Sequence, residues 1–293
     1  MSDFKERYEK YLCLINDEIG KLFGGCREVG TEGLVESMLY SLNAGGKRIR
    51  PVLTLEFCRI LCDDFMQAMP IALSLELMHT YSLIHDDLPC MDNDDFRRGK
   101  PTNHRVFGET TAVLAGDSLQ AEAFCMILNS AIPTERRARC SEILANAVGT
   151  KGICGGQYID TVLDSKELSL EMLYEKTMKK TAALIKAACM MGAAAAGACE
   201  NSVIKAGLFG ENLGMAFQIR DDVLDEIGSS EKLGKSCGSD IKSEKTTFLT
   251  VYGKERCEEL VKEYTERAKR EIEGVCDSEF LFALADSLVC REN

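Results

Sequence analysis

Several residue types and patterns are scarce in this chain of 293 residues, and each scarcity excludes a class of protein. Only 3 histidines occur, and none of the 14 cysteines belongs to a Cys-x-x-Cys pair, so the ligand spacing of structural zinc sites is absent. No apolar run reaches the length of a membrane span, and polar residues 1–10 contain no apolar core of a secretory signal. We therefore expect a cytoplasmic protein with reduced thiols and no membrane span.

Proline is also rare, with 5 residues, and long alternating runs of β-branched residues are missing. Hydrophobic residues make up 45% of the chain, enough for a real core, and good helix formers recur throughout. These features predict an all-α fold. Amphipathic helical patterns cover residues 4–23, 34–42, 50–61, 70–86, 109–128, 135–153, 170–198, 201–228, 254–274 and 278–291.

No linker-like segment or shift in composition interrupts these patterns. We therefore predict a single domain, residues 1–293, in which the helices form an antiparallel bundle around a central cavity. The predicted helix 170–198 is rich in alanine and glycine. Small residues there fit either close helix packing or room for a long apolar ligand, and the sequence leaves both readings open.

The formal net charge is −12 and the pI about 4.9, which argues against binding to nucleic acid. An acidic protein can still bind a diphosphate where local lysines, arginines or metal ions reverse the field.

One cluster of aspartates lies within an apolar helical segment. Asp221 and Asp225 are four residues apart, so they share a helix face about 6 Å apart along the axis, with Asp222 beside them. Like charges at this spacing destabilise a bare helix. Divalent cations bound by carboxylate oxygens would relieve the repulsion.

A second cluster, Asp86, Asp87 and Asp92, follows another apolar helical pattern, where Pro89 ends the helix. Mg²⁺ typically joins one or two carboxylates to substrate phosphates. Two carboxylate clusters facing one cavity would therefore hold a diphosphate from both sides and favour its departure as a leaving group.

Blocks along nearly the whole chain resemble trans-isoprenyl diphosphate synthases of bacterial and plant type. Residues 76–104, beginning ELMHTYSLIHDDLP, resemble the first aspartate-rich motif of that family, and residues 217–225, FQIRDDVLD, resemble the second. The further matching blocks are GGKRIRP at 45–51, LAGD at 114–117, GGQ at 155–157, KTA at 180–182, GK at 234–235 and GSD at 238–240.

The resemblance implies head-to-tail condensation of isopentenyl diphosphate with an allylic diphosphate by a homodimer. It implies a cluster of Mg²⁺ ions held by Asp86, Asp92 and Asp221, with Asp87 and Asp225 as further ligands and Asp222 beside them. The residues it assigns to the allylic diphosphate are Arg97, Lys180 and Lys235. Those it assigns to isopentenyl diphosphate are Lys47, Arg50, His79 and Arg98. Thr181 and Gln218 are placed near the reacting carbons, and Lys245 is a further basic contact.

Taken singly, these residues have plainer interpretations. Lys47 and Arg50 could be solvated charges, His79 a structural histidine, the pair at 97–98 a loop charge pair and Gln218 a core amide. Their collective order along the chain favours the functional interpretation. Two departures from the family pattern, Cys154 and the segment after Thr246, affect no proposed metal ligand.

Product length should depend on the side chains below the first aspartates. Tyr81 and Ser82 lie about 7.5 and 6 Å down a helix that ends at Asp86, roughly one turn, which is the scale of an isoprene unit. An aromatic residue there resembles bacterial farnesyl diphosphate synthases and predicts a C15 product. The alternative is that Tyr81 faces a neighbouring helix and leaves the cavity unchanged.

Other functions stay open. A geranyl or geranylgeranyl product needs only a different cavity depth. A class I terpene cyclase would normally lack the Lys47, Arg50 and His79 set, and a non-catalytic partner subunit usually loses motif residues, none of which is missing here.

Overall fold

A computed structural model describes residues 2–24, 29–163, 168–228, 246–275 and 277–289. Helices dominate these residues, and the one sheet among them is an antiparallel hairpin in which Phe96 pairs with Pro101 and Arg97 with Lys100. The all-α prediction is confirmed. The prediction of a single domain over residues 1–293 stays a prediction.

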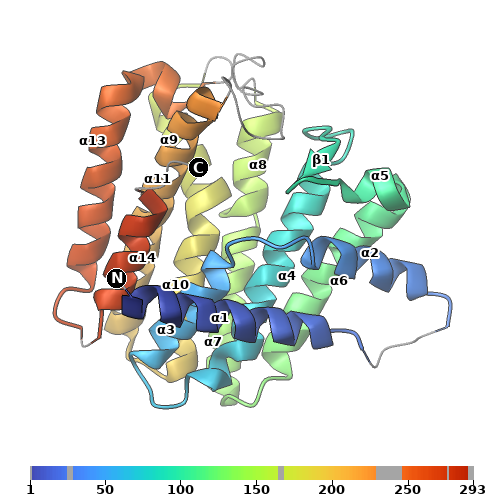
Figure 1. Cartoon of the computed structure of the whole chain (residues 1–293), viewed down its shortest axis with the longest axis horizontal. Coiled ribbons are helices and arrows are strands. Elements are labelled where there is room, and N and C mark those ends of the chain that lie inside the picture. The colour runs from blue at the N-terminus through green and yellow to red at the C-terminus, as the bar shows by residue number, and fades with distance from the viewer. Residues whose placement is uncertain (1, 25–28, 164–167, 229–245, 276, 290–293) are drawn as a thin grey trace.

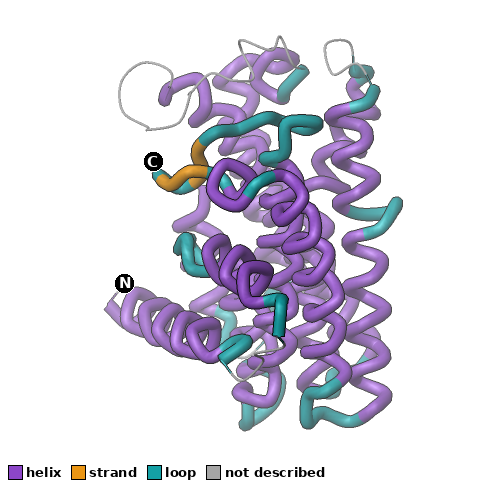
Figure 2. The backbone as a smooth tube through the Cα atoms, turned by 90° about the vertical axis from the view of Figure 1, so that its right-hand side faces the viewer, coloured by secondary structure: helices purple, strands orange, loops and turns teal. Residues whose placement is uncertain are grey.

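The helices form a bundle that α1 crosses at a steep angle (Figures 1 and 2). In chain order the elements are α1 (Ser2–Lys21), α2 (Glu32–Leu42), α3 (Ile49–Arg59), the 3₁₀ turn η1 (Phe65–Ala68), α4 (Met69–Asp86), β1 (Phe96–Arg97), β2 (Lys100–Pro101), α5 (Asn103–Phe107), α6 (Glu109–Leu128), α7 (Thr134–Val148), α8 (Ile153–Thr161), α9 (Leu170–Thr177), the π-helical turn η3 (Met178–Ala182), α10 (Ala183–Ala196), α11 (Glu200–Gly228), α13 (Phe248–Glu271) and α14 (Glu279–Val289).

The centre of the bundle is α10, which packs against α11, α3 and α7, while α4 packs against α6 and α3. Small side chains in α10 allow this close approach: a Cβ atom on Gly192 would lie 2.4 Å from the carbonyl oxygen of Thr54 in α3. The Thr54 hydroxyl also donates to the carbonyl of Ala188 at 3.0 Å. Close helix packing is therefore the structural reason for the small residues around Gly192.

A smaller apolar cluster joins α9, α11 and α13. Leu173, Ile219, Val223 and Phe248 are buried in it. Their burial fixes the start of α13 against α11, beside the second aspartate cluster.

Several predicted helix limits were wrong. The segment predicted as one helix over 135–153 is two helices, because α7 ends at Val148 and α8 begins at Ile153. The predicted helix 170–198 contains the π turn η3. The predicted helix start at Lys254 is confirmed, because the non-helical Gly253 (φ 75°) divides α13 into a short part from Phe248 and a long part from Lys254 to Glu271. The hairpin and α5, both within the loop predicted after residue 86, were not anticipated.

Among the described helices, α6 alone is long and apolar enough to cross a membrane by length and composition. It packs against α4 and α2 within the bundle, however, and core helices of globular proteins meet the same criterion.

Candidate active site

A polar cleft opens at one end of the bundle. Its volume is ≈ 590 Å³, including space open to solvent. Its walls come from α8, α9, η3 and α11, from the loop after α4 and from the start of α13. The lining residues are Asp92, Asp160, Leu173, Lys176, Thr177, Lys180, Thr181, Gln218, Asp222 and Thr247. Residues of both predicted aspartate clusters therefore share one cleft.

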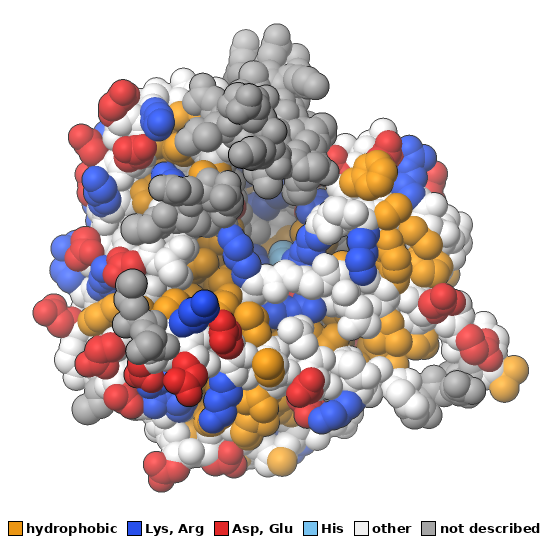
Figure 3. Space-filling model, viewed as in Figure 1, with side chains coloured by type: hydrophobic (Ala, Val, Ile, Leu, Met, Phe, Trp, Pro, Cys, Tyr) orange, Lys and Arg blue, Asp and Glu red, His pale blue; other side chains and the backbone are white. Residues whose placement is uncertain are grey.

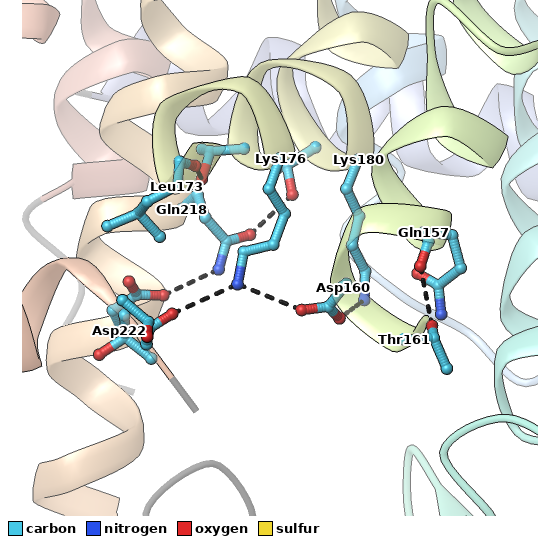
Figure 4. A network of polar contacts seen from close by, with 12 residues as sticks. Gln157, Asp160, Thr161, Leu173, Lys176, Lys180, Gln218 and Asp222 are labelled. Carbon is cyan, nitrogen blue, oxygen red and sulfur yellow. Dashed lines mark hydrogen bonds and ion pairs between the residues drawn. The ribbon is translucent and has the colours of Figure 1, made fainter. Parts of the chain in front are cut away.

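Two lysines converge on a single buried carboxylate in this cleft (Figure 4). Asp160 of α8 accepts from Lys180 at 2.6 Å and from Lys176 at 3.1 Å, and Lys176 also donates to the carbonyl of Thr246 at 3.4 Å. Burial opposes the charge of Lys180, but Asp160 and Asp86 outweigh it and raise its pKa. The cleft thus holds two ammonium groups on one carboxylate.

Lys180 lies in the π-helical turn η3. Such turns are frequent at functional sites because the extra residue redirects side chains. Sequence reasoning predicted Lys180 and missed Asp160 and Lys176. Asp160 follows Gln157 of the GGQ block by three residues, on the same helix face, which was the available signal.

A chain of hydrogen bonds connects η3 with the second aspartate cluster (Figure 4). Thr181 donates to the Gln218 carbonyl oxygen at 2.7 Å, and the Gln218 amide donates to Asp222 at 2.9 Å. The other oxygen of Asp222 accepts from the backbone N–H of Phe248 at 2.9 Å. Asp222 therefore orients Gln218 and the start of α13, and the predicted pair of Thr181 and Gln218 lies together at the cleft.

The remaining members of that cluster, Asp221 and Asp225, lie one helical turn apart on α11. Lys235 and Lys245, predicted to contact phosphate, lie outside the described residues.

The first aspartate cluster folds back on itself after α4. Asp86 ends the helix, and the backbone N–H of Asp92 donates to the carbonyl of Asp86 at 2.9 Å. Burial, together with the neighbouring Asp92 and Asp87, raises the pKa of Asp86 to about 6, although Lys180 acts in the opposite direction. The carboxylates therefore repel one another in the protein alone.

Asp87 differs from Asp86 in its side-chain contacts. It is buried, and its two oxygens accept from Arg97 Nε at 2.7 and 2.9 Å. Asp87 thus fixes Arg97 beside the cluster. Its assignment as a metal ligand stays a prediction.

The donor chemistry of both clusters fits Mg²⁺. Among the described residues, no three Asp, Glu, His or Cys side chains converge closely enough to form a complete metal site. Mg²⁺ completes its coordination with water and substrate phosphate, so carboxylates on two sides of a diphosphate are the expected partial ligand set.

A second cationic group surrounds His79 on α4. Burial, and then Arg50, Arg98 and Arg97, lower the pKa of His79 well below its usual value, so the imidazole is neutral. Burial and Arg98 likewise lower the pKa of Arg50 to about 10, against the attraction of Glu76. The buried Nε of Arg50 has no hydrogen-bond partner within the protein. An unsatisfied buried donor among repelling cations indicates a site for an anion.

The side chains that frame this cationic group are themselves fixed. Arg48 pairs with Glu76 at 2.6 Å, both side chains being buried, and Arg98 donates to the carbonyl of Gly45. Lys47 is exposed at the same turn, and its carbonyl accepts from Tyr8 at 2.5 Å. Figure 3 shows lysine and arginine side chains around a hollow that has a histidine at its base. The structure thus brings together the predicted residues Arg50, His79 and Arg98, while Lys47 lies on the turn that precedes α3.

Gly46 leaves room for the guanidinium of Arg98. A Cβ atom on Gly46 would lie 2.8 Å from Arg98 Cζ. We expect Gly46→Ala to displace Arg98 and to raise about tenfold the KM for isopentenyl diphosphate, the substrate that the family resemblance assigns to this group of residues, since a charge-assisted hydrogen bond is lost. Steady-state kinetics with that substrate varied would measure the effect.

Gly108→Ala is the matched control for this prediction. Gly108 also has a positive φ, 84° against 129° for Gly46, but no atom lies within 4 Å of the place that a Cβ atom would take there. Both variants carry backbone strain, whereas only Gly46→Ala disturbs Arg98. Equal KM values for the two variants would contradict the prediction.

The two residues predicted to set product length lie on α4 below Asp86. Tyr81 is buried, and its hydroxyl lies 3.4 Å from the Cys154 sulfur on α8. Ser82 is also buried, and its hydroxyl donates to the carbonyl of His79 in its own helix at 2.9 Å. Tyr81 therefore reaches across to a neighbouring helix, whereas Ser82 turns back on α4.

The two remaining histidines have structural contacts. His85 Nε2 lies 3.0 Å from the carbonyl of Val113 on α6, and His104 is buried in α5 with Nδ1 3.2 Å from the Thr102 hydroxyl.

Residues 31–279 match the polyprenyl synthetase family. The chain belongs to this family. It is 42% identical over 266 residues to the farnesyl diphosphate synthase of Bacillus subtilis, covering 89% of this chain and 90% of that protein. It is 44% identical over 264 residues to a geranylgeranyl diphosphate synthase of Cyanophora paradoxa, covering 89% and 88%. The crystal structure of an FPP/GFPP synthase from Zymomonas mobilis is similar, with a TM-score of 0.87, 31% identity and coverage of 99% and 100%.

This membership makes the chain a prenyltransferase of isoprenoid biosynthesis, and the predicted family resemblance is confirmed. The relatives divide between farnesyl and geranylgeranyl synthases, so membership leaves the product length open.

Proposed function

We propose that the protein condenses isopentenyl diphosphate head to tail with dimethylallyl and then geranyl diphosphate, giving farnesyl diphosphate and releasing diphosphate. The observation that supports this most strongly is the pairing of two phosphate sites. One contains Lys176, Lys180 and the aspartates, and the other contains Arg50, Arg98 and neutral His79. A one-substrate reaction would need only the first site.

The chain's own residues bind and orient the two substrates. Lys180 and Arg97 face the allylic diphosphate, and Lys47, Arg50, His79 and Arg98 the diphosphate of isopentenyl diphosphate. When bound by Asp86, Asp92 and Asp221, Mg²⁺ would neutralise charge that develops on the departing diphosphate. Thr181 and Gln218 provide fixed oxygen dipoles beside the electron-poor allylic carbon.

Condensation breaks one bond and forms another. The C–O bond of the allylic diphosphate breaks, and the double bond of isopentenyl diphosphate supplies the electron pair for the new C–C bond. The proton lost afterwards passes to the released diphosphate, so no protein base is required.

The C15 product rests on Tyr81. Tyr81 lies about 7.5 Å below Asp86 along the axis of α4, on the scale of one to two isoprene units, so its ring should stop growth after one or two additions. The hydroxyl is bonded to another helix, so the ring cannot turn aside freely.

We expect Tyr81→Ala to change the main product from C15 to C20 or longer, because removing the ring deepens the cavity. Product chromatography with labelled isopentenyl diphosphate and each allylic starter measures this. Tyr264→Ala, which removes a partly buried tyrosine from α13, should leave the product unchanged. A C15 main product from Tyr81→Ala would contradict the C15 proposal.

The alternative products are geranyl and geranylgeranyl diphosphate, and the same chromatography distinguishes them. A class I terpene cyclase is less favoured, because it would not use the cationic group around His79. Hydrocarbon formed from farnesyl diphosphate alone would support a cyclase. Absence of diphosphate release with both substrates and Mg²⁺ would support a non-catalytic partner subunit.

We also propose that the active form is a homodimer formed through α6. Val113, Leu114 and Leu128 on this helix are 39%, 50% and 53% exposed, which is unusual for large apolar side chains on one helix. A second copy would bury them. The ten cysteines among the described residues are all free thiols, which supports a reducing, cytoplasmic location.

Light scattering of the purified protein should give twice the chain mass of 32.4 kDa. We expect Leu114→Glu to give the mass of a single chain, since a buried charge without a partner opposes association. Ile204→Glu on α11 changes a side chain of similar exposure, 48%, and should stay dimeric. A single-chain mass for the unmodified protein at micromolar concentration would exclude the homodimer.

A further inference from the structure

A side-chain bridge connects α4 with α8 below the first aspartates. The Tyr81 hydroxyl lies 3.4 Å from the Cys154 sulfur. The two helices pack mainly on other partners, α4 on α6 and α3, and α8 on η3 and α9. The Tyr81 side chain therefore connects two helices whose backbones pack mainly against other elements.

The other contacts of Tyr81 restrict its ring. The His85 ring meets it edge to face, with centroids 5.3 Å apart at 84°, and His85 is itself 3.0 Å from the carbonyl of Val113. Burial and then Cys154 raise the pKa of Tyr81, while a hydrogen bond from Gln120 of α6 acts the other way. The hydroxyl is therefore protonated at neutral pH, accepts from Gln120 and shares a hydrogen bond with the Cys154 thiol.

We propose that Cys154 is a specificity-determining residue that positions Tyr81 and so fixes where chain elongation stops. This inference rests on the proposed function, in which the Tyr81 ring closes the elongation cavity. The ring can close the cavity only while it points from α4 toward α8. Cys154 supplies the hydrogen-bond partner that holds it there, and without that partner the ring yields more easily to a growing chain.

Cys154 is suited to substitution because its side chain is exposed, so replacing it disturbs little packing. Cys154→Val removes the hydrogen-bonding group at similar size, whereas Cys154→Ser keeps one. We expect Cys154→Val to raise the ratio of C20 to C15 product about fivefold, equivalent to ~1 kcal/mol for one hydrogen bond. Cys154→Ser should keep the ratio of the unmodified enzyme.

Tyr81→Phe tests the same bond from its other end. It should raise the ratio by a similar factor, and the double variant Tyr81→Phe/Cys154→Val should show no further increase, because both changes remove one interaction. The KM for geranyl diphosphate should stay within twofold throughout, since Cys154 contacts no phosphate site. If Cys154→Val proves unstable, Cys154→Ala provides the same comparison.

An unchanged ratio in Cys154→Val, an equal rise in Cys154→Ser, or full additivity in the double variant would each overturn the role of Cys154. The control that separates this inference from the proposed function is Tyr81→Ala. If Tyr81→Ala lengthens the product and Cys154→Val does not, only the role of Cys154 fails. If Tyr81→Ala leaves C15 as the main product, the cavity-closing role of Tyr81 fails as well.

Discussion

Replacing Asp86 by Asn is expected to lower the rate of prenyl transfer about a thousandfold and to raise the thermal stability of the metal-free protein. The loss of rate follows from removing a carboxylate that would hold Mg²⁺ against the departing diphosphate, where one preorganised electrostatic contact contributes about 10²–10³ in kcat. Steady-state diphosphate release with both substrates measures this loss.

The stability gain follows from the raised pKa of Asp86, about 6 in the folded protein against 3.8 for an ordinary aspartate. Such a group favours the folded state fully below pH 3.8, and this contribution is lost as pH rises through 6. At pH 7 the ionised carboxylate therefore costs stability, which Asn restores. The melting temperature should rise by at least about 2 °C at pH 7, and the difference should shrink as the pH falls from 6 and vanish below pH 3.8.

The matched control is Asp63→Asn, which neutralises an exposed aspartate between α3 and η1 and should change neither rate nor stability. Mg²⁺ with inorganic diphosphate should raise the melting temperature of the unmodified protein and not that of Asp86→Asn. A rate within tenfold of the unmodified enzyme would remove Asp86 from the metal-binding set.

The aspartate clusters were predictable because their spacing within helices already determines which side chains share a face. The spacing does not determine partners from other elements. Asp160 receives Lys176 and Lys180 because α8 and the α9–η3 segment pack side by side. No local pattern in the sequence specifies that packing.

Asp87 illustrates a further limit of sequence reasoning. Its position between Asp86 and Asp92 predicts a metal ligand, whereas its burial and its contacts with Arg97 depend on how the hairpin folds back over α4. The hairpin was not predicted, because its strands have two residues each and carry no periodicity. Position in the motif therefore predicted where the site lies, but not the role of each carboxylate.

Helix limits failed for a different reason. Residues 149–152, which separate α7 from α8, are Gly-Thr-Lys-Gly, so the two glycines were a break signal that the predicted helix 135–153 ignored. The predicted helix 170–198 shows the opposite case. Its small residues are plain in the sequence, but the reason for them lies in α3, whose Thr54 carbonyl oxygen would lie 2.4 Å from a Cβ atom on Gly192. Close packing is a property of two segments, and a sequence pattern describes one.

Gly192→Ala is expected to destabilise the protein by about 3 kcal/mol, at the upper end of the cost of overpacking a core. The added Cβ would meet the Thr54 carbonyl oxygen at 2.4 Å and the Phe57 Cβ at 2.9 Å. One is a backbone atom and the other is bonded directly to the backbone, so neither can rotate away. The helices α3 and α10 must therefore separate. Thermal unfolding followed by circular dichroism should show a fall in melting temperature of several degrees.

Gly20→Ala provides the control, because Gly20 is helical and exposed, with nothing within 4 Å of its Cβ position. It should stabilise the protein by about 0.5–1 kcal/mol through helix propensity alone. Gly192→Ala brings the same gain in helix propensity, so a net loss of stability in that variant measures the cost of the clash. If Gly192→Ala were as stable as Gly20→Ala, α3 and α10 would not be packed against each other through this residue, and the small side chains of α10 would regain their other interpretation, room for an apolar ligand.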